Sequence, residues 1–348
     1  MCCLHTPKLP CAPDQIDHFL SGPSAGVVEA AASMAGPVGV LGAGGKMGLH
    51  VAAMLRKALD RAGRSGVPVY AVSRFGSVNS REEFARFGVD TIAADLLDAG
   101  ALEALPDMGT VFFLAGIKFG TGNDPDALRR FNEEMPAMVA QRFRSSVSVA
   151  LSTGCVYPFV PAGSAGSSED DEPGPSGDYA VSCRGRELAY EKVSREAGTR
   201  VVLIRLNYSV EFRYGVLVDI AQRVLAGQPV NVSTGRVNAI WQRDAVDHII
   251  RSAAIAASPA VPLNVTGSPA LSVRAVAMEF GKLLGREAVI TGEEEASAWL
   301  GNPARAHSLF GPPEVNAQQM MEWIAAWLLA GGTTHGKPTK FENRDGKF

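Results

Sequence analysis

The sequence lacks the features that would mark a membrane, nucleic-acid-binding or metal-dependent protein. No apolar run approaches the roughly 20 residues that a membrane span needs. The net charge of −3 over 348 residues gives no basic field for nucleic acid and no polybasic patch for a lipid surface. The first 35 residues show no charged segment followed by an apolar one, so no export signal is expected. We therefore expect a cytoplasmic protein with neither nucleic-acid nor membrane partners.

Cysteine and histidine are few and scattered. The five cysteines and six histidines show neither a disulfide framework nor the paired spacing of a zinc site. No metal is therefore predicted. Hydrophobic residues make up 46% of the chain and charged residues 20%, a balance typical of a folded protein with a sizeable core.

A glycine-dense turn between an apolar run at 38–41 and a helix-like run at 49–59 is the most informative stretch. Gly42 can take a tight turn, and Gly44 or Gly45 lets backbone N–H groups approach a pyrophosphate. Gly48 lets the helix pack close to the strand, so that the helix N-terminus meets the phosphate charge. This order predicts a dinucleotide site, although an ordinary glycine-rich turn is the alternative. The expected contacts are Gly42, Gly44, Gly45, Lys46, Met47 and Gly48.

Strand-like and helix-like runs alternate from residue 38 to about 205. The strands are expected at 38–41, 67–72, 89–93, 110–114, 147–151 and 200–205, and the helices at 49–59, 80–87, 99–105, 126–143 and 179–197. Such alternation predicts an α/β fold with a doubly wound parallel sheet of the Rossmann type. Beyond 205 the pattern loosens, with helices expected at 216–226, 244–256, 272–284 and 316–329.

We divide the chain into four parts. Residues 1–36 are expected to form an N-terminal extension with a short helix near 14–20, and residues 37–205 the Rossmann core that binds NAD(P) and carries the catalytic motifs. Residues 206–330 would form a small C-terminal substrate lobe within the same compact unit, and 331–348 a tail. The tail is rich enough in aromatic residues to dock on the body or on a partner subunit, and a frayed end is the alternative.

Cofactor choice is set where the second strand ends. An acidic residue there would bind ribose hydroxyls, but this strand ends in Ser73 and Arg74, which can pair with a 2′-phosphate. NADP(H) is therefore favoured and NAD(H) remains an option, with Arg74 as a solvated loop residue in that case. Two further pairs are expected against the cofactor: Asp95 and Leu96 near the adenine, and Ala115 and Gly116 beneath it.

Two later motifs resemble those of a known family. Ser152-Thr-Gly-Cys-Val-Tyr157 looks like Ser-Ser-x-x-Val-Tyr, and Tyr179-Ala-Val-Ser-Cys183-x-x-x-Glu187 looks like Tyr-x-x-Ser-Lys-x-x-x-Glu. With the glycine turn, they resemble the extended short-chain dehydrogenases/reductases, the NAD(P)-dependent epimerase/dehydratase group, over residues 38–329. The resemblance implies that Thr153 hydrogen-bonds the reacting oxygen and that Tyr179 is the general acid or base. It implies an oxidoreductase, an epimerase or a dehydratase, and makes a homodimer plausible.

One position departs from the family. In the family, a lysine four residues after the catalytic tyrosine contacts the nicotinamide ribose and lowers the pKa of the tyrosine. Here that position is Cys183, which we therefore expect to contact the cofactor. A free tyrosine has a pKa of about 10 and is a poor base near neutrality. Three explanations for the missing lysine are open. Lys118, after the fourth strand, could supply the positive charge, or the reaction could need only an acid or an orienting hydroxyl. Alternatively, the protein could be a non-catalytic NAD(P)-binding sensor or scaffold. Arg184 and Arg186 are expected to point elsewhere.

The substrate is less well defined by the sequence. Asn207, Arg213, Tyr214 and Trp241 are the candidate substrate contacts, each with a structural role as the alternative. Family members that act on nucleotide sugars carry an Arg-Asp pair where this chain has Val237 and Asn238, so the expected diphosphate clamp is missing unless Arg236 or Arg243 replaces it. We expect a small polar substrate, with a carbohydrate-derived molecule as one option.

Overall fold

A parallel sheet forms the centre of the computed structural model, which describes residues 7–76, 78–118 and 124–344. Seven strands of these residues pair in the order β12-β7-β5-β4-β1-β2-β3. Their bounds are β1 (Val38–Leu41), β2 (Val69–Ser73), β3 (Asp90–Ala93), β4 (Thr110–Phe113), β5 (Val147–Thr153), β7 (Val201–Leu206) and β12 (Val261–Val265). All the neighbouring pairs are parallel, which confirms the predicted doubly wound α/β fold.

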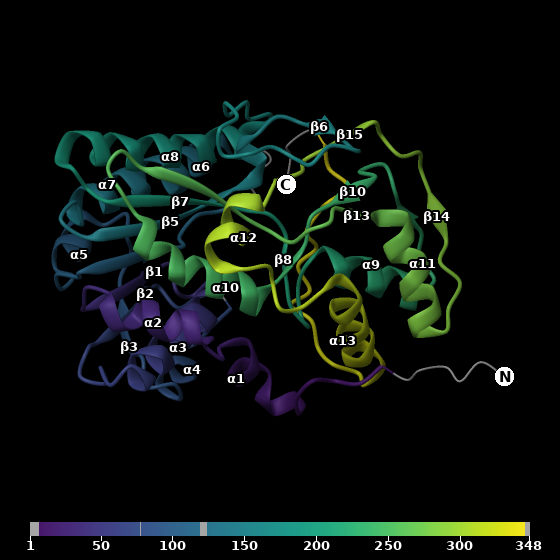
Figure 1. The fold of residues 1–348 in the computed structure, drawn as a ribbon, viewed down its shortest axis with the longest axis horizontal. Coiled ribbons are helices and arrows are strands. Elements are labelled where there is room, and N and C mark those ends of the chain that lie inside the picture. The colour runs from purple at the N-terminus through teal and green to yellow at the C-terminus, as the bar shows by residue number, and fades with distance from the viewer. Residues whose placement is uncertain (1–6, 77, 119–123, 345–348) are drawn as a thin grey trace.

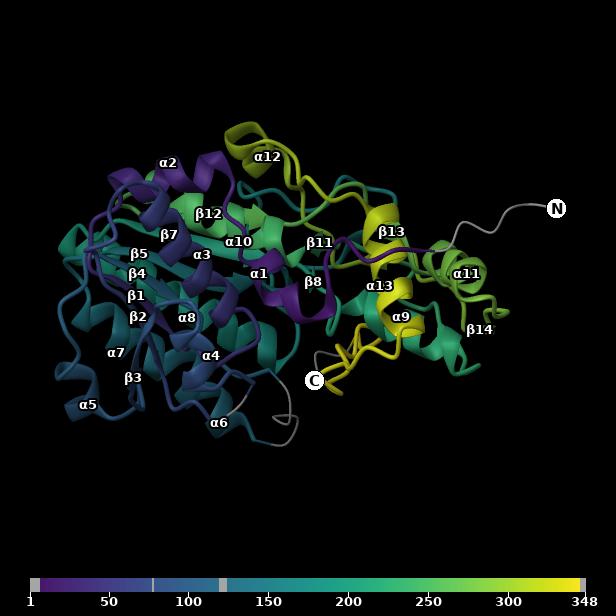
Figure 2. The ribbon, with the colours of Figure 1, turned by 90° about the horizontal axis from the view of Figure 1, so that it is seen from below.

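Both faces of the sheet are covered by helices (Figures 1 and 2). One face carries α2 (Ala25–Ser33), α3 (Gly48–Arg61), α4 (Arg81–Ala85) and α10 (Gln242–Arg251), and the other α5 (Ala99–Glu103), α6 (Pro125–Arg129), α7 (Met135–Arg142) and α8 (Asp178–Ala197). Successive strand side chains point to opposite faces. Accordingly Phe112 packs into the core beneath α3, whereas Phe113 packs into the core beneath α7 and α8.

A smaller lobe lies beside the sheet, at the right in Figure 1. Its helices are α9 (Val216–Leu225), α11 (Val273–Leu284) and α13 (Ala317–Leu329), which pack around a separate apolar core. Short strand pairs complete it and join it to the sheet: β8 (Ser209–Val210) with β11 (Ile240–Trp241), β9 (Val230–Asn231) with β14 (Ile290–Thr291), β10 (Arg236–Val237) with β13 (Leu271–Ser272), and β6 (Val160–Pro161) with β15 (Ser297–Ala298). The remaining elements are η1 (Pro13–Gln15), α1 (Ile16–Leu20), the π-helix η2 (Arg130–Glu134), η3 (Gly154–Val156), η4 (Ser252–Ile255) and α12 (Ala304–Phe310).

The N-terminal segment is more ordered than the sequence suggests. Helix α2 begins at the cap Ser24, whose hydroxyl accepts a hydrogen bond from the N–H of Val27, and it buries Val27 and Ala31 against α3 and α10. Arg64 donates hydrogen bonds to the carbonyls of Ala31 and Met34. These contacts make residues from 16 onward part of the body of the protein.

The elements that were not predicted include α2, α12, the edge strand β12 and several of the two-residue strands, such as β6 and β15. The helix expected at 126–143 is interrupted by a π-helical segment at Arg130–Glu134, which matters for the site described below. Among the described residues, no helix has the length and apolar character of a membrane span.

Candidate active site

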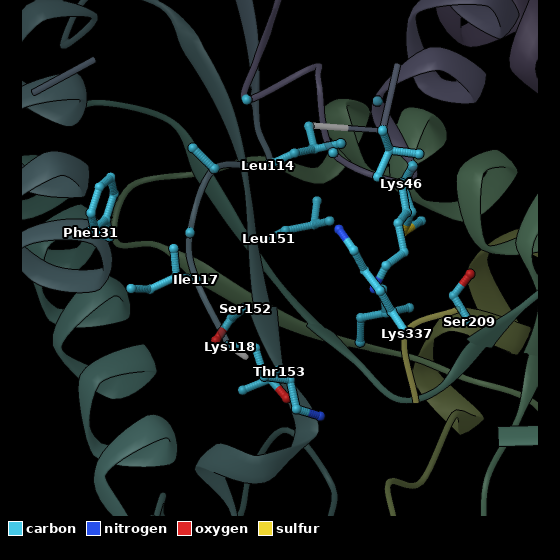
Figure 3. A pocket seen from close by; sticks show the side chains of 18 of the residues that line it. Lys46, Leu114, Ile117, Lys118, Phe131, Leu151, Ser152, Thr153, Ser209 and Lys337 are labelled. Carbon is cyan, nitrogen blue, oxygen red and sulfur yellow. The ribbon is translucent and has the colours of Figure 1, made fainter. Parts of the chain in front are cut away.

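A large cavity opens at the carboxyl ends of the strands, where the chain order reverses around β1. Strand β1 lies between β2 and β4, so the loops that follow β1 and β4 separate and leave a crevice. The cavity has a volume of about 960 Å³. It is lined by the glycine turn, the ends of β2 to β5, the start of α8, the segment after β7 and residues 336–340 of the tail (Figure 3).

The glycine turn has the geometry that its sequence predicts. Gly42 has φ +85°, and a Cβ there would lie 2.5 Å from the backbone nitrogen of Ala115. At Gly48 a Cβ would lie 2.0 Å from the carbonyl oxygen of Ala43, so only glycine lets α3 start this close to β1. Gly45 is exposed in the cavity, whereas Gly44 is buried and accepts hydrogen bonds from the loop after β2. Lys46 and Met47 also line the cavity.

One end of the cavity gathers the residues predicted for the adenosine. Ser73, Arg74, Asp95 and Leu96 line it, and the Arg74 guanidinium lies 3.7 Å from the Asp95 carboxylate. The same guanidinium lies 5.6 Å from the centre of the Phe131 ring. Phe131 was not predicted, because its helix pattern gives no sign that the π-helical turn directs it toward the cavity.

The three predicted catalytic side chains meet at the other end. Thr153 ends β5, and its hydroxyl accepts a hydrogen bond from the N–H of Cys155. The Lys118 Nζ lies 5.5 Å from the centre of the Tyr179 ring. All three line the cavity, with Ser152, whose buried hydroxyl has no partner among the described residues. Figure 3 labels Lys118, Ser152 and Thr153 at this end of the pocket.

Cys183 does not reach the cavity. It is fully buried in a cluster with Val156 and Tyr157, where the Tyr179 hydroxyl hydrogen-bonds its sulfur. Burial raises the pKa of both groups, and for Tyr179 this hydrogen bond adds to the effect. A cysteine side chain is too short to extend past the tyrosine as a lysine would, so the expected cofactor contact at this position is absent from the cavity lining that the structure describes.

Arg186 contradicts the expectation that it points away. Seven residues are about two helical turns, so Arg186 lies on the same face of α8 as Tyr179 and Cys183. It is buried, donates to the Leu151 carbonyl and the Asn132 amide oxygen, and its positive charge opposes the rise in the Tyr179 pKa. The helical period was therefore the signal that the sequence interpretation missed.

The loop that carries Lys118 is held by Asn132, in the π-helical turn. The Asn132 side chain accepts a hydrogen bond from the N–H of Ile117 and donates one to its carbonyl, at 3.0 and 2.9 Å. Gly116, with φ +157°, passes so close that a Cβ would lie 2.1 Å from the Arg186 guanidinium. The cavity is lined by Ala115, Gly116 and Lys118. The hydrogen bonds of Asn132 therefore hold in place the part of the cavity wall that joins the glycine turn to the catalytic end.

The four substrate candidates separate into two groups. Asn207 and Tyr214 line the cavity, and the Lys46 Nζ lies 3.5 Å above the centre of the Tyr214 ring. Arg213 and Trp241 are not among the described lining residues. Arg213 pairs with Asp17 and Glu211, and Trp241 is buried in the apolar core of the lobe.

The arginines considered as replacements for the diphosphate clamp lie elsewhere. Val237 and Asn238 are both buried, and Asn238 hydrogen-bonds the backbone at 267 and 301. Arg236 is exposed, while Arg243 pairs with Glu314, and neither is among the described residues that line the cavity.

The lining residues fit a nicotinamide dinucleotide. The turn leaves no room for side chains at Gly42 and Gly48, exposes backbone beside Gly45, and adds a cation at Lys46. Apolar walls from Leu114, Leu151, Phe131 and Met135 suit flat rings. Among the described residues, no group of three or more His, Cys, Asp or Glu side chains could hold a metal ion.

Comparisons with known proteins agree with this geometry. The family model described as NAD dependent epimerase/dehydratase family matches residues 38–254. Among solved structures, MoeE5 in complex with UDP-glucose and NAD has a TM-score of 0.68 at 20% identity, covering 85% of this chain and 99% of that one. The UDP-glucose 4-epimerase of Thermus thermophilus in complex with NAD has a TM-score of 0.68 at 20% identity, covering 83% and 97%.

A dTDP-glucose 4,6-dehydratase is similar too. The DesIV double mutant from Streptomyces venezuelae has a TM-score of 0.70 at 17% identity, covering 84% of this chain and 97% of that one. No curated protein matches the chain. At these identities the solved structures show the shared fold.

Proposed function

The chain belongs to the NAD dependent epimerase/dehydratase family, enzymes of the extended short-chain dehydrogenase/reductase type, and from that premise we propose its reaction. It moves a hydride between NADP(H) and a hydroxyl or carbonyl group of a small, polar, carbohydrate-derived substrate. The observation that carries the proposal is that Thr153, Tyr179 and Lys118 share one cavity with the glycine turn. MoeE5 binds UDP-glucose and NAD, and the Thermus thermophilus UDP-glucose 4-epimerase binds NAD, which supports a sugar-like substrate for this chain.

The bound cofactor supplies the hydride, and the side chains manage the oxygen and its proton. Thr153 hydrogen-bonds the reacting oxygen and orients it toward Tyr179. Burial raises the pKa of Tyr179, so its hydroxyl carries a proton at neutral pH and is suited to donate it. In the direction of reduction, Tyr179 would give its proton to the carbonyl oxygen, and the alcohol would result once the carbonyl carbon has received the hydride that bound NADPH would supply. The Lys118 ammonium stabilises the phenolate that remains.

Replacement of Tyr179 by Phe tests this assignment. The variant keeps the ring that packs against Cys183 but loses the proton, so turnover of carbonyl-sugar substrates should fall by about 100-fold or more. Cofactor affinity, measured by nicotinamide fluorescence, should stay within about 2-fold of the wild type. Undiminished turnover by Tyr179→Phe would reject the role of Tyr179. If the wild type turned over none of the sugar nucleotides and keto sugars tried, a non-catalytic sensor would be favoured. Interconversion of substrate isomers with cofactor retained would identify an epimerase.

The preference for NADP(H) rests on Arg74. Its guanidinium is largely exposed beside Ser73 at the adenosine end, and only Asp95 competes for it there among the described residues. Arg74→Ala should weaken NADP(H) binding by about 10-fold while leaving NAD(H) binding nearly unchanged. Arg81→Ala is the matched control, since Arg81 contacts Thr91 and is not among the described lining residues. An equal effect on both cofactors would contradict the assignment.

A further inference from the structure

The C-terminal segment 333–344, here called the strap, is built into the wall of the active-site cavity. Phe341 is 2% exposed in the core of the lobe, and Thr234 donates a hydrogen bond to its carbonyl. Both the N–H and the hydroxyl of Thr339 donate to the Asp219 carboxylate, each at 2.6 Å. Such anchors give the strap one fixed course across the lobe.

Both ends of the strap are fastened as well. At its start, the N–H of His335 donates to the Arg213 carbonyl at 3.0 Å. At its end, Arg344 donates two hydrogen bonds to Ser297, at 2.7 and 2.8 Å, and its guanidinium lies 4.2 Å from the Phe159 ring. The strap therefore runs from the lobe to the loop that follows β5, along the rim of the cavity.

Between these anchors the strap presents lysines to the cavity. Residues 336–340 all line it, and Lys337 and Lys340 flank the anchored Thr339. In Figure 3 the Lys337 side chain extends into the cavity toward Leu151, at the end of β5. Among the described residues, neither strap lysine forms an ion pair with a carboxylate.

The charges around the cavity are unbalanced at this end. The described lining residues include five basic side chains and one acidic one, Asp95, which lies beside Arg74 at the adenosine end. The other four basic groups are lysines. Burial, together with the charges of Lys337 and Lys118, lowers the pKa of Lys46 to about 8. Burial also lowers the pKa of Lys118, and the charge of Lys340 adds to that effect, while the Asp219 carboxylate behind the strap opposes the lowering of both the Lys46 and the Lys118 pKa. Mutual repulsion of this kind is relieved by a bound anion.

The cofactor accounts for only part of this charge. Its pyrophosphate would lie at the glycine turn, where Lys46 and the start of α3 are available. The strap lysines come from the segment that is anchored on the substrate lobe, and Lys337 lies near enough to Lys46 for its charge to lower the Lys46 pKa. No replacement for the clamp missing at 237–238 lies among the other described lining residues of that lobe, because Asn207, Tyr208, Ser209 and Tyr214 are uncharged.

We propose that Lys337 and Lys340 of the strap bind an anionic group of the substrate, a phosphate or a carboxylate, and so select charged sugar derivatives. The inference rests on the proposed function, since it names the class of substrate for the same cavity. The strap is then a working part of the site, and Asp219 and Ser297 position it.

The test uses a double variant, Lys337→Gln with Lys340→Gln, which removes both charges and keeps most of the side-chain length. Lys192→Gln is the matched control, on the exposed surface of α8. Inorganic pyrophosphate and malonate are the probes for phosphate and carboxylate chemistry. Each is titrated by calorimetry into the protein with and without saturating NADPH, and NADPH itself is titrated into every variant.

The expected result is that at least one probe binds the NADPH-loaded wild type, and that the double variant binds it about 10-fold more weakly. Probe binding by the Lys192 variant, and the affinity of every variant for NADPH, should be unchanged. The probe that binds more tightly identifies the substrate anion. Equal probe binding by the wild type and the double variant would overturn the inference. It would also be overturned if the double variant bound NADPH more weakly and NADPH prevented the probes from binding the wild type, because the lysines would then contact the cofactor.

Failure of the proposed function is distinguishable from failure of this inference. If no nicotinamide cofactor binds the wild type, the proposed function is wrong. The comparison of wild type with double variant in cofactor-free protein then still decides whether the strap lysines bind anions. A melting temperature for the double variant equal to that of Lys192→Gln excludes misfolding as the cause of lost binding.

Discussion

Replacement of Lys118 by Met tests whether a lysine from another loop supplies the charge that the family places four residues after the tyrosine. The Lys118 Nζ lies 5.5 Å from the centre of the Tyr179 ring, and the site around it is partly buried. With an effective dielectric constant of about 20, a unit positive charge at that distance stabilises a developing phenolate by about 3 kcal/mol. Such a loss slows the chemical step by roughly 100-fold.

The assay is steady-state turnover across pH, on the carbonyl substrate that wild type reduces. Lys118→Met should lower kcat by roughly 100-fold at neutral pH. Lys118→Arg should retain most activity and extend it to higher pH, because burial lowers the pKa of Lys118 whereas an arginine stays protonated. Lys192→Met, on the exposed face of α8, serves as control. An unchanged kcat and pH–rate profile for Lys118→Met would refute the reasoning.

Three further predictions concern the cofactor turn and the scaffold behind it. The pKa of Lys46 is about 8, so NADPH affinity should fall as pH rises through 8, and Lys46→Gln should abolish that pH dependence. Lys57→Gln is the control and should leave the pH dependence unchanged, because Lys57 also has a pKa of about 8 but does not line the cavity. Glu187→Ala leaves a buried arginine without its carboxylate and should lower the free energy of unfolding by about 3–5 kcal/mol, measured with urea. Gly48→Ala puts a Cβ 2.0 Å from a backbone oxygen and should weaken NADPH binding at least about 10-fold, while Gly66→Ala, in open space, should have no effect.

Each of these has a contradicting outcome. NADPH affinity that stays constant from pH 7 to about 10 would show that Lys46 does not contact the cofactor. A loss of less than about 1 kcal/mol on replacing Glu187 would show that the buried pair is not essential to the scaffold. Normal NADPH binding by Gly48→Ala would mean that the turn does not hold the pyrophosphate.

The fold was predictable because its signals are local. Apolar runs of four to seven residues mark the buried parallel strands, and a glycine is visible wherever a Cβ cannot fit, as at Gly42 and Gly48. Thr153, Tyr179 and Lys118 follow or flank strands that end at one edge of the sheet, so their convergence follows from topology. Edge strand β12 was missed because its polar and proline residues weaken the apolar pattern.

The remaining site residues depend on long-range packing. Lys337 and Lys340 reach the cavity only because Phe341 and Thr339 anchor the strap to the lobe, more than 100 residues away in sequence. Nothing near position 337 indicates such a partner. Tryptophan is a residue type that often contacts ligands, but Trp241 is buried among the apolar and aromatic side chains of the lobe. Composition alone does not distinguish these two environments.

Titration of the wild-type protein with NADPH and NADH, followed by calorimetry and by nicotinamide fluorescence, tests the central claim most directly. The account predicts saturable binding of one nicotinamide cofactor per chain, with NADPH bound more tightly than NADH. Binding of neither, in protein that carries no cofactor from purification, would contradict the claim that this cavity is a dinucleotide-dependent active site.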